Sequence, residues 1–279
     1  MQHQLIPEPK DLDARKMHKS TKLDLYGRGL RRVPASLWEM SHLQVLNLAE
    51  NQLSSIPASI GILKSLSMLD LGHNKLRSAP ESIGKLVNLR YLYLSNNRLT
   101  SIPRSIGRLK ALLYLNVTDN ELTRLPTSLR KLRKLIELRL YNNQIKSLPN
   151  SIGGLVQLRE MHAMNNNLAS IPSSIGRCKK LRKLILQGNK IASLPDSLGN
   201  MVNLTDLDLR YNDLSSLPDS IGRLKKLRFL DLRANKLESL PASLAKLTRL
   251  EKLDLRWNRF DSLPKWLFQL ERRGCVVYT

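Results

Sequence analysis

Leucine and isoleucine alternate with polar residues in a pattern that repeats every 23 residues along most of the 279-residue chain. One copy begins at Leu46, reads LNLAENQLSSIPASIGIL and ends at Leu63. A proline keeps the same step, without an insertion, from Pro34 to Pro264. A fixed period of this length is typical of a solenoid, in which each unit contacts only its neighbours. The sequence therefore predicts a long column of stacked coils with an aliphatic core.

The first half of each coil predicts a short strand followed by a bend. Leu46 and Leu48 alternate with outward neighbours, so both leucines face the core. Asn51 follows at the bend, and its amide carries two donors and an acceptor, so we expect it to bond to the coils on both sides. Its recurrence predicts a structural ladder of asparagines: Asn51, Asn74, Asn97, Asn120, Asn143, Asn166, Asn189, Asn212, Asn235 and Asn258.

The second half of each coil predicts a return along the opposite side. Proline restricts φ at its start, and a serine two residues later, as at Ser59, is expected to cap a short helical turn. Glycine recurs next, as at Gly61, but Arg130 and Phe268 occupy the same position in other coils. Bulky residues there argue against an obligatory positive φ, so a helical or 3-10 turn is expected.

The motif L-x-x-L-x-L-x-x-N-x-L, followed by I-P-x-S-I-G-x-L, resembles the intracellular 23-residue class of leucine-rich repeats. That class includes Ras-binding scaffolds, plant intracellular Ras-group-related proteins and bacterial proteins. The resemblance implies an α/β horseshoe-shaped solenoid, with a parallel concave sheet and short helical or 3-10 convex turns. It also implies signalling or regulatory protein partners, such as a small GTPase or a phosphatase.

The repeat divides the chain into three expected parts. Residues 1–19 are interpreted as an N-terminal cap, in which Asp11 begins a short helix. Residues 20–264 form about eleven repeat units. Residues 265–279 are expected to be a C-terminal cap with a last helical turn and a final edge strand, in which Val276 and Tyr278 take the inward positions.

Aromatic residues form only 5% of the chain, yet eight of them fall on outward strand positions of the expected concave face. Tyrosine, tryptophan and arginine dominate interface hot spots, so we predict a partner-binding surface there. Aromatic residues also suit strand surfaces in general, which is the alternative reading. The predicted surface contains Tyr91, Tyr93, Tyr114, Arg139, Tyr141, His162 and Met164, with Trp257 near the other end.

Charged columns follow toward the C-terminus, where aspartates run beside arginines on successive strands. Opposite neighbouring charges offset the repulsion within each column, so the columns either neutralise each other or form a charged pocket for a polar partner. Both interpretations remain open from the sequence. The residues are Asp208, Asp231 and Asp254, beside Arg210, Arg233 and Arg256.

The formal net charge is +23, and much of the excess falls on the expected convex turns. Clusters such as Arg130-Lys131-Leu-Arg133-Lys134 could attract an anionic membrane or nucleic acid. This electrostatic role is the alternative function, against a solvated face in a basic proteome. No aromatic residues alternate with the charges, which weighs against nucleic acid.

Catalytic and cofactor motifs are missing from the sequence: there is no phosphate loop, nucleophile elbow, paired cysteine motif or H-E-x-x-H. The five histidines lack ligand spacing, so no metal and no cofactor are expected. The N-terminus has no apolar signal region, and the two cysteines suit a reducing compartment. We predict a non-catalytic cytoplasmic scaffold that binds a protein, with a secreted host-directed effector as a further alternative; oligomeric state stays open.

Overall fold

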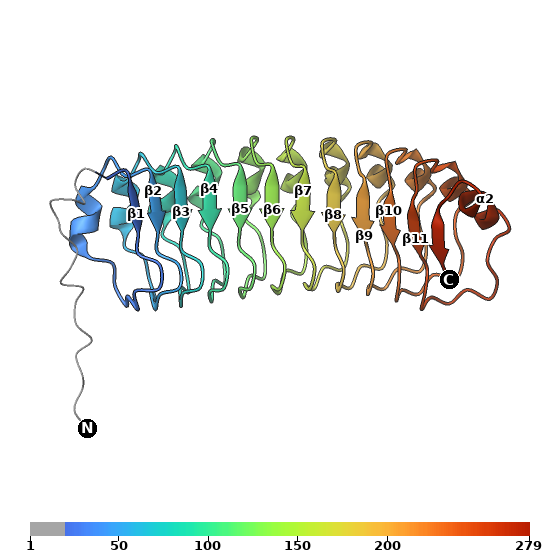
Figure 1. The fold of residues 1–279 in the computed structure, drawn as a ribbon, viewed down its shortest axis with the longest axis horizontal. Helices are drawn as coiled ribbons and strands as arrows, with labels where there is room; N and C mark the ends of the chain where they lie inside the picture. The colour runs from blue at the N-terminus through green and yellow to red at the C-terminus, as the bar shows by residue number, and fades with distance from the viewer. Residues whose placement is uncertain (1–19) are drawn as a thin grey trace, which may run out of the picture.

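The computed structural model of the protein describes residues 20–279, so the cap expected at residues 1–19 lies outside the described part. Each coil contributes one strand, and the strands lie side by side in a single row (Figure 1). They form a 12-stranded parallel sheet in sequence order. The strands are β1 (Lys22–Asp24), β2 (Val45–Asn47), β3 (Met68–Asp70), β4 (Tyr91–Tyr93), β5 (Tyr114–Asn116), β6 (Glu137–Arg139), β7 (Glu160–His162), β8 (Lys183–Ile185), β9 (Asp206–Asp208), β10 (Phe229–Asp231), β11 (Lys252–Asp254) and β12 (Val276–Tyr278).

Ten short 3-10 helices run along the opposite side of the described chain, as the Arg130 and Phe268 positions predicted. Each begins directly after the repeat proline, which has an extended ψ in most coils, for example Pro149 with ψ of 149°. They are η1 (Ala35–Glu39), η2 (Ala58–Ile62), η3 (Glu81–Lys85), η4 (Arg104–Arg108), η5 (Thr127–Lys131), η6 (Asn150–Gly154), η7 (Ser173–Arg177), η8 (Asp196–Asn200), η9 (Asp219–Arg223) and η10 (Ala242–Lys246). We call the sheet side the concave face and the 3-10 side the convex face.

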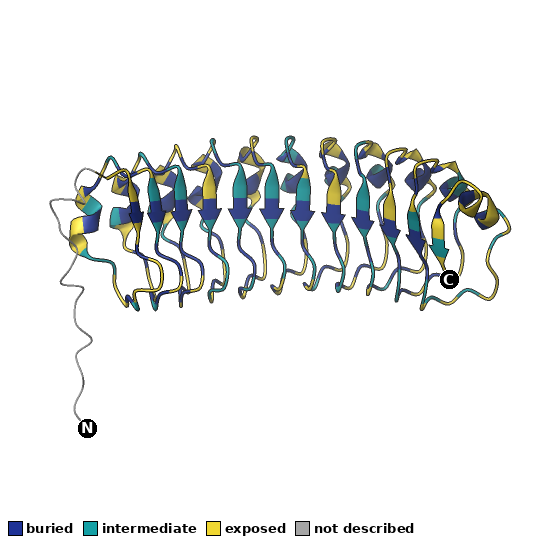
Figure 2. Ribbon diagram, viewed as in Figure 1, coloured by how far each residue is buried: buried dark blue, intermediate teal, exposed yellow. Residues whose placement is uncertain are grey.

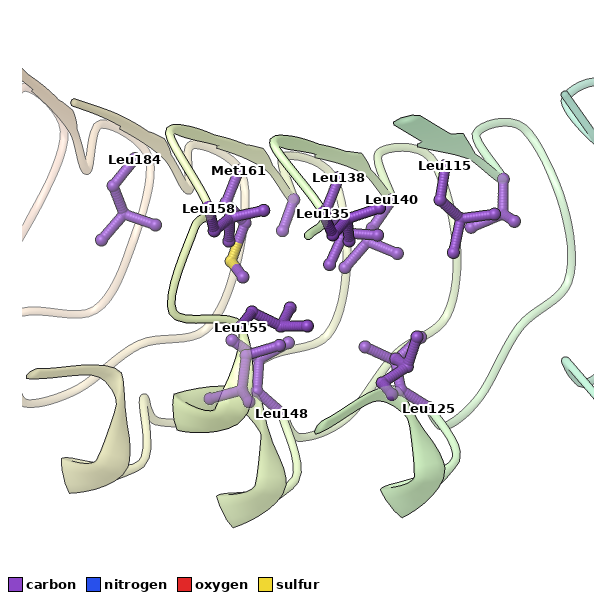
Figure 3. Close-up of a cluster of buried hydrophobic side chains, with 14 of the residues drawn as sticks. Leu115, Leu125, Leu135, Leu138, Leu140, Leu148, Leu155, Leu158, Met161 and Leu184 are labelled. Atoms are coloured by element: carbon purple, nitrogen blue, oxygen red, sulfur yellow. The ribbon is translucent and has the colours of Figure 1, made fainter. Parts of the chain in front are cut away.

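A continuous aliphatic core fills the space between the two faces. The middle residue of most strands is buried while its neighbours are more exposed (Figure 2). Leu115, Leu138 and Met161 point inward from successive strands toward Leu125, Leu148 and Leu155 (Figure 3). Because the identical register places one buried apolar side chain beside the next, each coil covers the apolar surface that its neighbour cannot cover alone.

The ladder asparagines bond to their own coil and to the preceding one. Asn143 accepts a hydrogen bond at Oδ1 from the Leu122 backbone N–H (3.0 Å). Its Nδ2 donates to the carbonyls of Val117 and Leu140, both at 3.0 Å. The same pattern recurs from Asn51 to Asn258. The expectation of bonds to both flanking coils was therefore wrong, because the side-chain amide bonds to its own coil and to the preceding coil but not to the following one.

The residue before each asparagine closes the bend in a left-handed conformation. Nine such non-glycine residues have φ between 51° and 61°, including Tyr211 and Trp257, and Gly188 has φ of 66°. A left-handed L-residue costs roughly 1–2 kcal/mol. The bend that this conformation closes brings the Asn143 Nδ2 within 3.2 Å of the Tyr141 carbonyl, to which it also donates. The local strain is offset by the buried hydrogen bonds that it permits.

The repeat serine does not cap the 3-10 helix, contrary to the sequence expectation. It lies inside the turn, the N-cap position is proline, and no side-chain cap bond forms. Eight serine hydroxyls from Ser82 to Ser243 are buried without a hydrogen-bond partner. Packing explains the residue instead: a Cβ added at Gly222 would lie 2.5 Å from the Ser243 carbonyl oxygen and 2.7 Å from its Cβ. Adjacent turns are so close that small residues must face each other.

The chain ends with helix α2 (Leu267–Glu271) and strand β12. The predicted register of this strand was wrong by one residue. Leu253 pairs with Val277, so Val277 packs against the core while Val276 and Tyr278 point outward. The helix adds one residue to the 23-residue step. The shift buries Cys275 and brings Tyr278 onto the concave face.

Replacing a ladder asparagine tests the role of its hydrogen bonds. Asn143→Ala leaves the Leu122 N–H and several carbonyls without the amide, so the free energy of unfolding should fall by about 2 kcal/mol or more. Urea denaturation followed by circular dichroism measures the change.

The matched control is Asn88→Ala, because Asn88 is exposed and its side chain donates one bond to the Lys64 carbonyl. Its expected loss is below about 0.5 kcal/mol. Equal losses in the two variants would contradict the ladder's role.

Candidate functional site

The concave face carries a contiguous aromatic patch on strands β4 to β6, which we define as Tyr91, Tyr93, Tyr114, Arg139 and Tyr141. Tyr91 is 38% exposed, and the other four side chains are half-buried. None of them belongs to the hydrophobic core. The strand alternation explains this placement, since Leu92, Leu115 and Leu138 between them face inward.

Direct contacts join the centre of the patch. The rings of Tyr93 and Tyr114 lie with centroids 5.0 Å apart at 40°, and the Arg139 guanidinium lies 5.8 Å from the Tyr114 centroid. The Arg139 Nε donates to Glu137 at 2.6 Å, which holds the guanidinium beside the ring. Burial raises the pKa of Tyr93 and raises that of Tyr114 to about 12. The hydroxyls of Tyr93 and Tyr114 therefore remain neutral hydrogen-bonding groups at physiological pH.

His162 joins an acidic cluster beside the patch. Its Nε2 lies 3.1 Å from Glu160, which Lys183 also approaches at 3.5 Å. Ligand atoms of Glu137, Glu160 and His162 lie within 4.8 Å of one another, a grouping that the spacing of the histidines did not indicate. Glu137 is already held by Arg139 and Glu160 by Lys183, so a divalent cation would have to displace both ion pairs. The two carboxylates instead hold Arg139 and His162 in place on the concave face.

The charged columns at β9 to β11 pair with each other. Arg233 Nη2 lies 2.7 Å from Asp231, and its Nε lies 3.3 Å from Asp254. Arg256 contacts Asp254 at 2.7 Å. Asp208 and Arg210 pair at 3.3 Å. Each arginine therefore has a carboxylate, and this geometry favours a self-neutralising ladder over an open charged pocket.

Two carboxyl groups of these columns respond oppositely to their surroundings. Burial raises the pKa of Asp208, and its backbone and ionic contacts with Arg210 do not fully offset this effect. Burial also acts to raise the pKa of Asp254, but the Arg256 hydrogen bond and the Arg233 charge outweigh it, so that pKa is lowered. Ionisation of Asp254 therefore stabilises the fold, whereas ionisation of Asp208 lowers the stability of the fold.

Further aromatic residues lie at the C-terminal end of the face. Tyr211 and Trp257 are 53% and 64% exposed, and their ring centroids are 6.3 Å apart. Arg256 lies 4.9 Å from the Tyr278 ring centroid. Sequence reasoning missed Tyr278 because its register depends on α2. Met164 was also predicted for the patch. It is half-buried, and its backbone carbonyl accepts a hydrogen bond from Asn166.

The convex face is basic, and its charges differ from those of the concave face. Arg130, Arg133 and Arg177 are exposed and, within residues 20–279, form no ion pair with a carboxylate. Lys225 and Lys226 bond to a backbone carbonyl and to Asn203 instead. The described helices include none that is both long and apolar enough to cross a bilayer.

Comparison with known families matches nearly the whole described chain. A leucine-rich repeat region model matches residues 77–187 and 195–272, and a leucine rich repeat model matches residues 21–76. A third leucine rich repeat model matches residues 180–201. No curated protein matches the sequence.

Similar solved structures come from bacteria and plants. A leucine-rich repeat protein of Leptospira interrogans is 24% identical with a TM-score of 0.65, over 95% of this chain and 97% of that one. An internalin of Listeria monocytogenes is 22% identical with a TM-score of 0.69, over 95% and 88%. These two likenesses show the fold alone.

A third structure is the ectodomain of a membrane receptor kinase from Arabidopsis thaliana, in complex with CASPARIAN STRIP INTEGRITY FACTOR 2. It is 31% identical with a TM-score of 0.67, over 91% of this chain and 37% of that one. The chain thus spans little more than a third of that ectodomain.

Two substitutions should separate the roles of the paired aspartates. Asp254→Asn removes an ionised group with a lowered pKa, so stability at pH 7 should fall by about 1–3 kcal/mol. Asp254 contributes that stability above its unfolded pKa of about 3.9 and loses it as pH falls through the lower folded value. The acid-induced decline of the wild type should therefore be shallower in Asp254→Asn.

Asp208→Asn is the matched control with the opposite sign, because its folded pKa is raised. Stability at pH 7 should be unchanged or higher, since the uncharged amide avoids the burial cost. Thermal unfolding of both variants and the wild type between pH 3 and pH 7 measures how the stability of each depends on pH. A loss at Asp208 as large as that at Asp254 would contradict the assignment.

Proposed function

This chain belongs to the leucine-rich repeat family, and we propose that it is a non-catalytic scaffold that binds a protein partner through the aromatic patch of its concave face. Members of the family with this fold are generally non-catalytic interaction proteins. The plant ectodomain named above was solved with a bound factor, which supports protein binding as the general role.

The observation that carries the proposal is the exposure of linked aromatic rings on a sheet whose core needs none of them. The structure packs leucine and isoleucine inside and leaves Tyr91, Tyr93 and Tyr114 outside. Rigid aromatic side chains next to arginine supply large contact area at small entropic cost. Arg139 is held in place by Glu137, so little of its freedom remains to be lost on binding.

We place the partner in signalling or regulation, and the likeness to Ras-binding repeat scaffolds suggests a small GTPase or a phosphatase. Binding would occupy β4 to β7 and reach His162, which is 17% exposed at its side chain. The ion-paired columns at β9 to β11 would lie at the rim, where charges affect association rate more than affinity.

A cytoplasmic location is part of the same proposal. Cys178 and Cys275 are both buried and unbridged, and burial raises the pKa of Cys178 to about 11. Free thiols of this kind suit a reducing compartment. Cell fractionation would test the location, and recovery of the protein in an exported fraction would contradict it.

Removing the central ring pair tests the patch. In Tyr93→Ala/Tyr114→Ala, the affinity for a captured partner should fall by about 30-fold or more, because central aromatic residues contribute at least about 2 kcal/mol in hot spots. The melting temperature should change little, since both half-buried rings lie outside the core and their pairing is worth about 0.5–1.5 kcal/mol.

The control is Tyr26→Ala/Tyr211→Ala, which removes two exposed tyrosines outside the patch. Quantitative pull-down with wild type and both double variants, followed by titration of the purified partner, compares them. A partner retained by the Tyr93/Tyr114 variant, or lost equally from both variants, would overturn the patch assignment.

A further inference from the structure

The convex face contains a hollow of about 760 Å³ between η5 and η6. Its wall includes Arg130, Arg133 and Arg177, and its floor includes Gly153 and Gly154. A volume of this order accommodates a small ligand. Two departures from the repeat, one in each neighbouring coil, shape its floor and wall.

The two departures compensate each other. In most coils the glycine of the turn faces the repeat serine of the next coil, and Gly61 also faces Lys85, whose Cδ lies 2.9 Å from an added Cβ. At η5 the glycine is replaced by Arg130, and at η6 the long side chain is replaced by Gly154. A Cβ added at Gly154 would lie 2.7 Å from the Arg130 Cβ. Arg130 therefore requires Gly154, and the exchange leaves the floor of the hollow bare.

The arginines around this hollow are free to bind an anion. Within residues 20–279, no carboxylate lies within ion-pair distance of Arg130, Arg133 or Arg177. The arginines of the concave columns differ, because Arg210, Arg233 and Arg256 each pair with aspartate. Guanidinium groups bind phosphate oxygens bidentately, and unpaired ones offer their donors without breaking an existing contact.

Other hollows on the convex face lack this combination. One of about 540 Å³ beside η9 includes Asp219 in its lining. Another of about 910 Å³ beside η2 and η3 has two lysines but only one arginine, Arg108, and is bordered by the apolar Ile62 and Val87. Only the η5–η6 hollow, among those three, has three arginines and no carboxylate in its lining.

We propose that the hollow between η5 and η6 binds a phosphorylated headgroup, with Arg130, Arg133 and Arg177 contacting the phosphate oxygens above the Gly153–Gly154 floor. The ligand carries more than one phosphate group, because three guanidinium groups surround a space larger than one phosphate. The headgroup belongs to an anionic lipid or to a free phosphate ester. This binding is independent of the concave patch, since the two surfaces lie on opposite faces of the sheet.

Two variants test the proposal by different means. Arg133→Gln/Arg177→Gln removes two guanidinium groups and keeps the hollow. Arg130→Gly/Gly154→Lys removes the Arg130 guanidinium, covers the glycine floor with a side chain and keeps the net charge. Arg31→Gln/Arg32→Gln is the matched control, because both residues are exposed on the first coil and lie outside the hollow.

Isothermal titration calorimetry with inositol hexakisphosphate measures the affinity for a soluble phosphate ester. Wild type should bind, both hollow variants should bind about tenfold or more weakly, and the control should remain within about twofold of wild type. Melting curves identify any variant that fails to fold, and the second hollow variant then decides. No binding by wild type, or equal binding by wild type and the Arg130→Gly/Gly154→Lys variant, would overturn the proposal.

Vesicle co-sedimentation distinguishes the two sources of the headgroup. Vesicles of phosphatidylcholine carry either phosphatidylinositol bisphosphate or phosphatidylserine at matched charge. Preference for the phosphoinositide, lost in the hollow variants, supports a lipid headgroup, whereas binding of the soluble probe alone supports a free phosphate ester. Equal sedimentation with both vesicle types together with no soluble binding would show diffuse electrostatic attraction and contradict the site.

Discussion

The buried asparagine at each bend is the interaction on which the rest of the solenoid depends. A chain that turns every few residues inside a column buries backbone groups that neither the sheet nor the 3-10 turns can satisfy. The amide oxygen accepts a hydrogen bond from the preceding coil, and the amide nitrogen donates to the preceding coil and to its own coil. Because each ladder residue must meet the same atoms of its neighbour, an insertion within a coil would leave these groups unpaired. The constraint accounts for the unbroken 23-residue step.

Strict register frees the outward strand positions for other purposes. The core is mostly leucine and isoleucine, so the aromatic residues of the patch and the ionic columns at β9 to β11 do not compete with it. The two halves of the concave face differ in consequence: the β4 to β6 half presents rings, whereas the β9 to β11 half satisfies its own charges. The convex face obeys another constraint, since close turns require glycine opposite serine, and an exchange of small and large residues there changes the surface shape.

The repeat period predicted the strands, the aliphatic core and the concave position of the tyrosines, because these follow from alternation and spacing alone. The period could not predict contacts that depend on three-dimensional distances. Ser82 looked like a cap, but its small size is needed against Gly61 of the preceding turn. Tyr278 was expected to face inward, since no local signal shows that α2 adds a residue to the step. The pairing of Arg233 with two aspartates likewise required the distance between neighbouring strands.

The central claim is that a leucine-filled column leaves its concave sheet available for a protein partner. Hydrogen exchange detected by mass spectrometry, compared between the free protein and its purified complex, tests this claim most directly. The account predicts slower exchange in peptides that contain β4 to β7, with the convex turns η3 to η7 unchanged. Protection confined to the convex turns, or to β9 to β12, would contradict it.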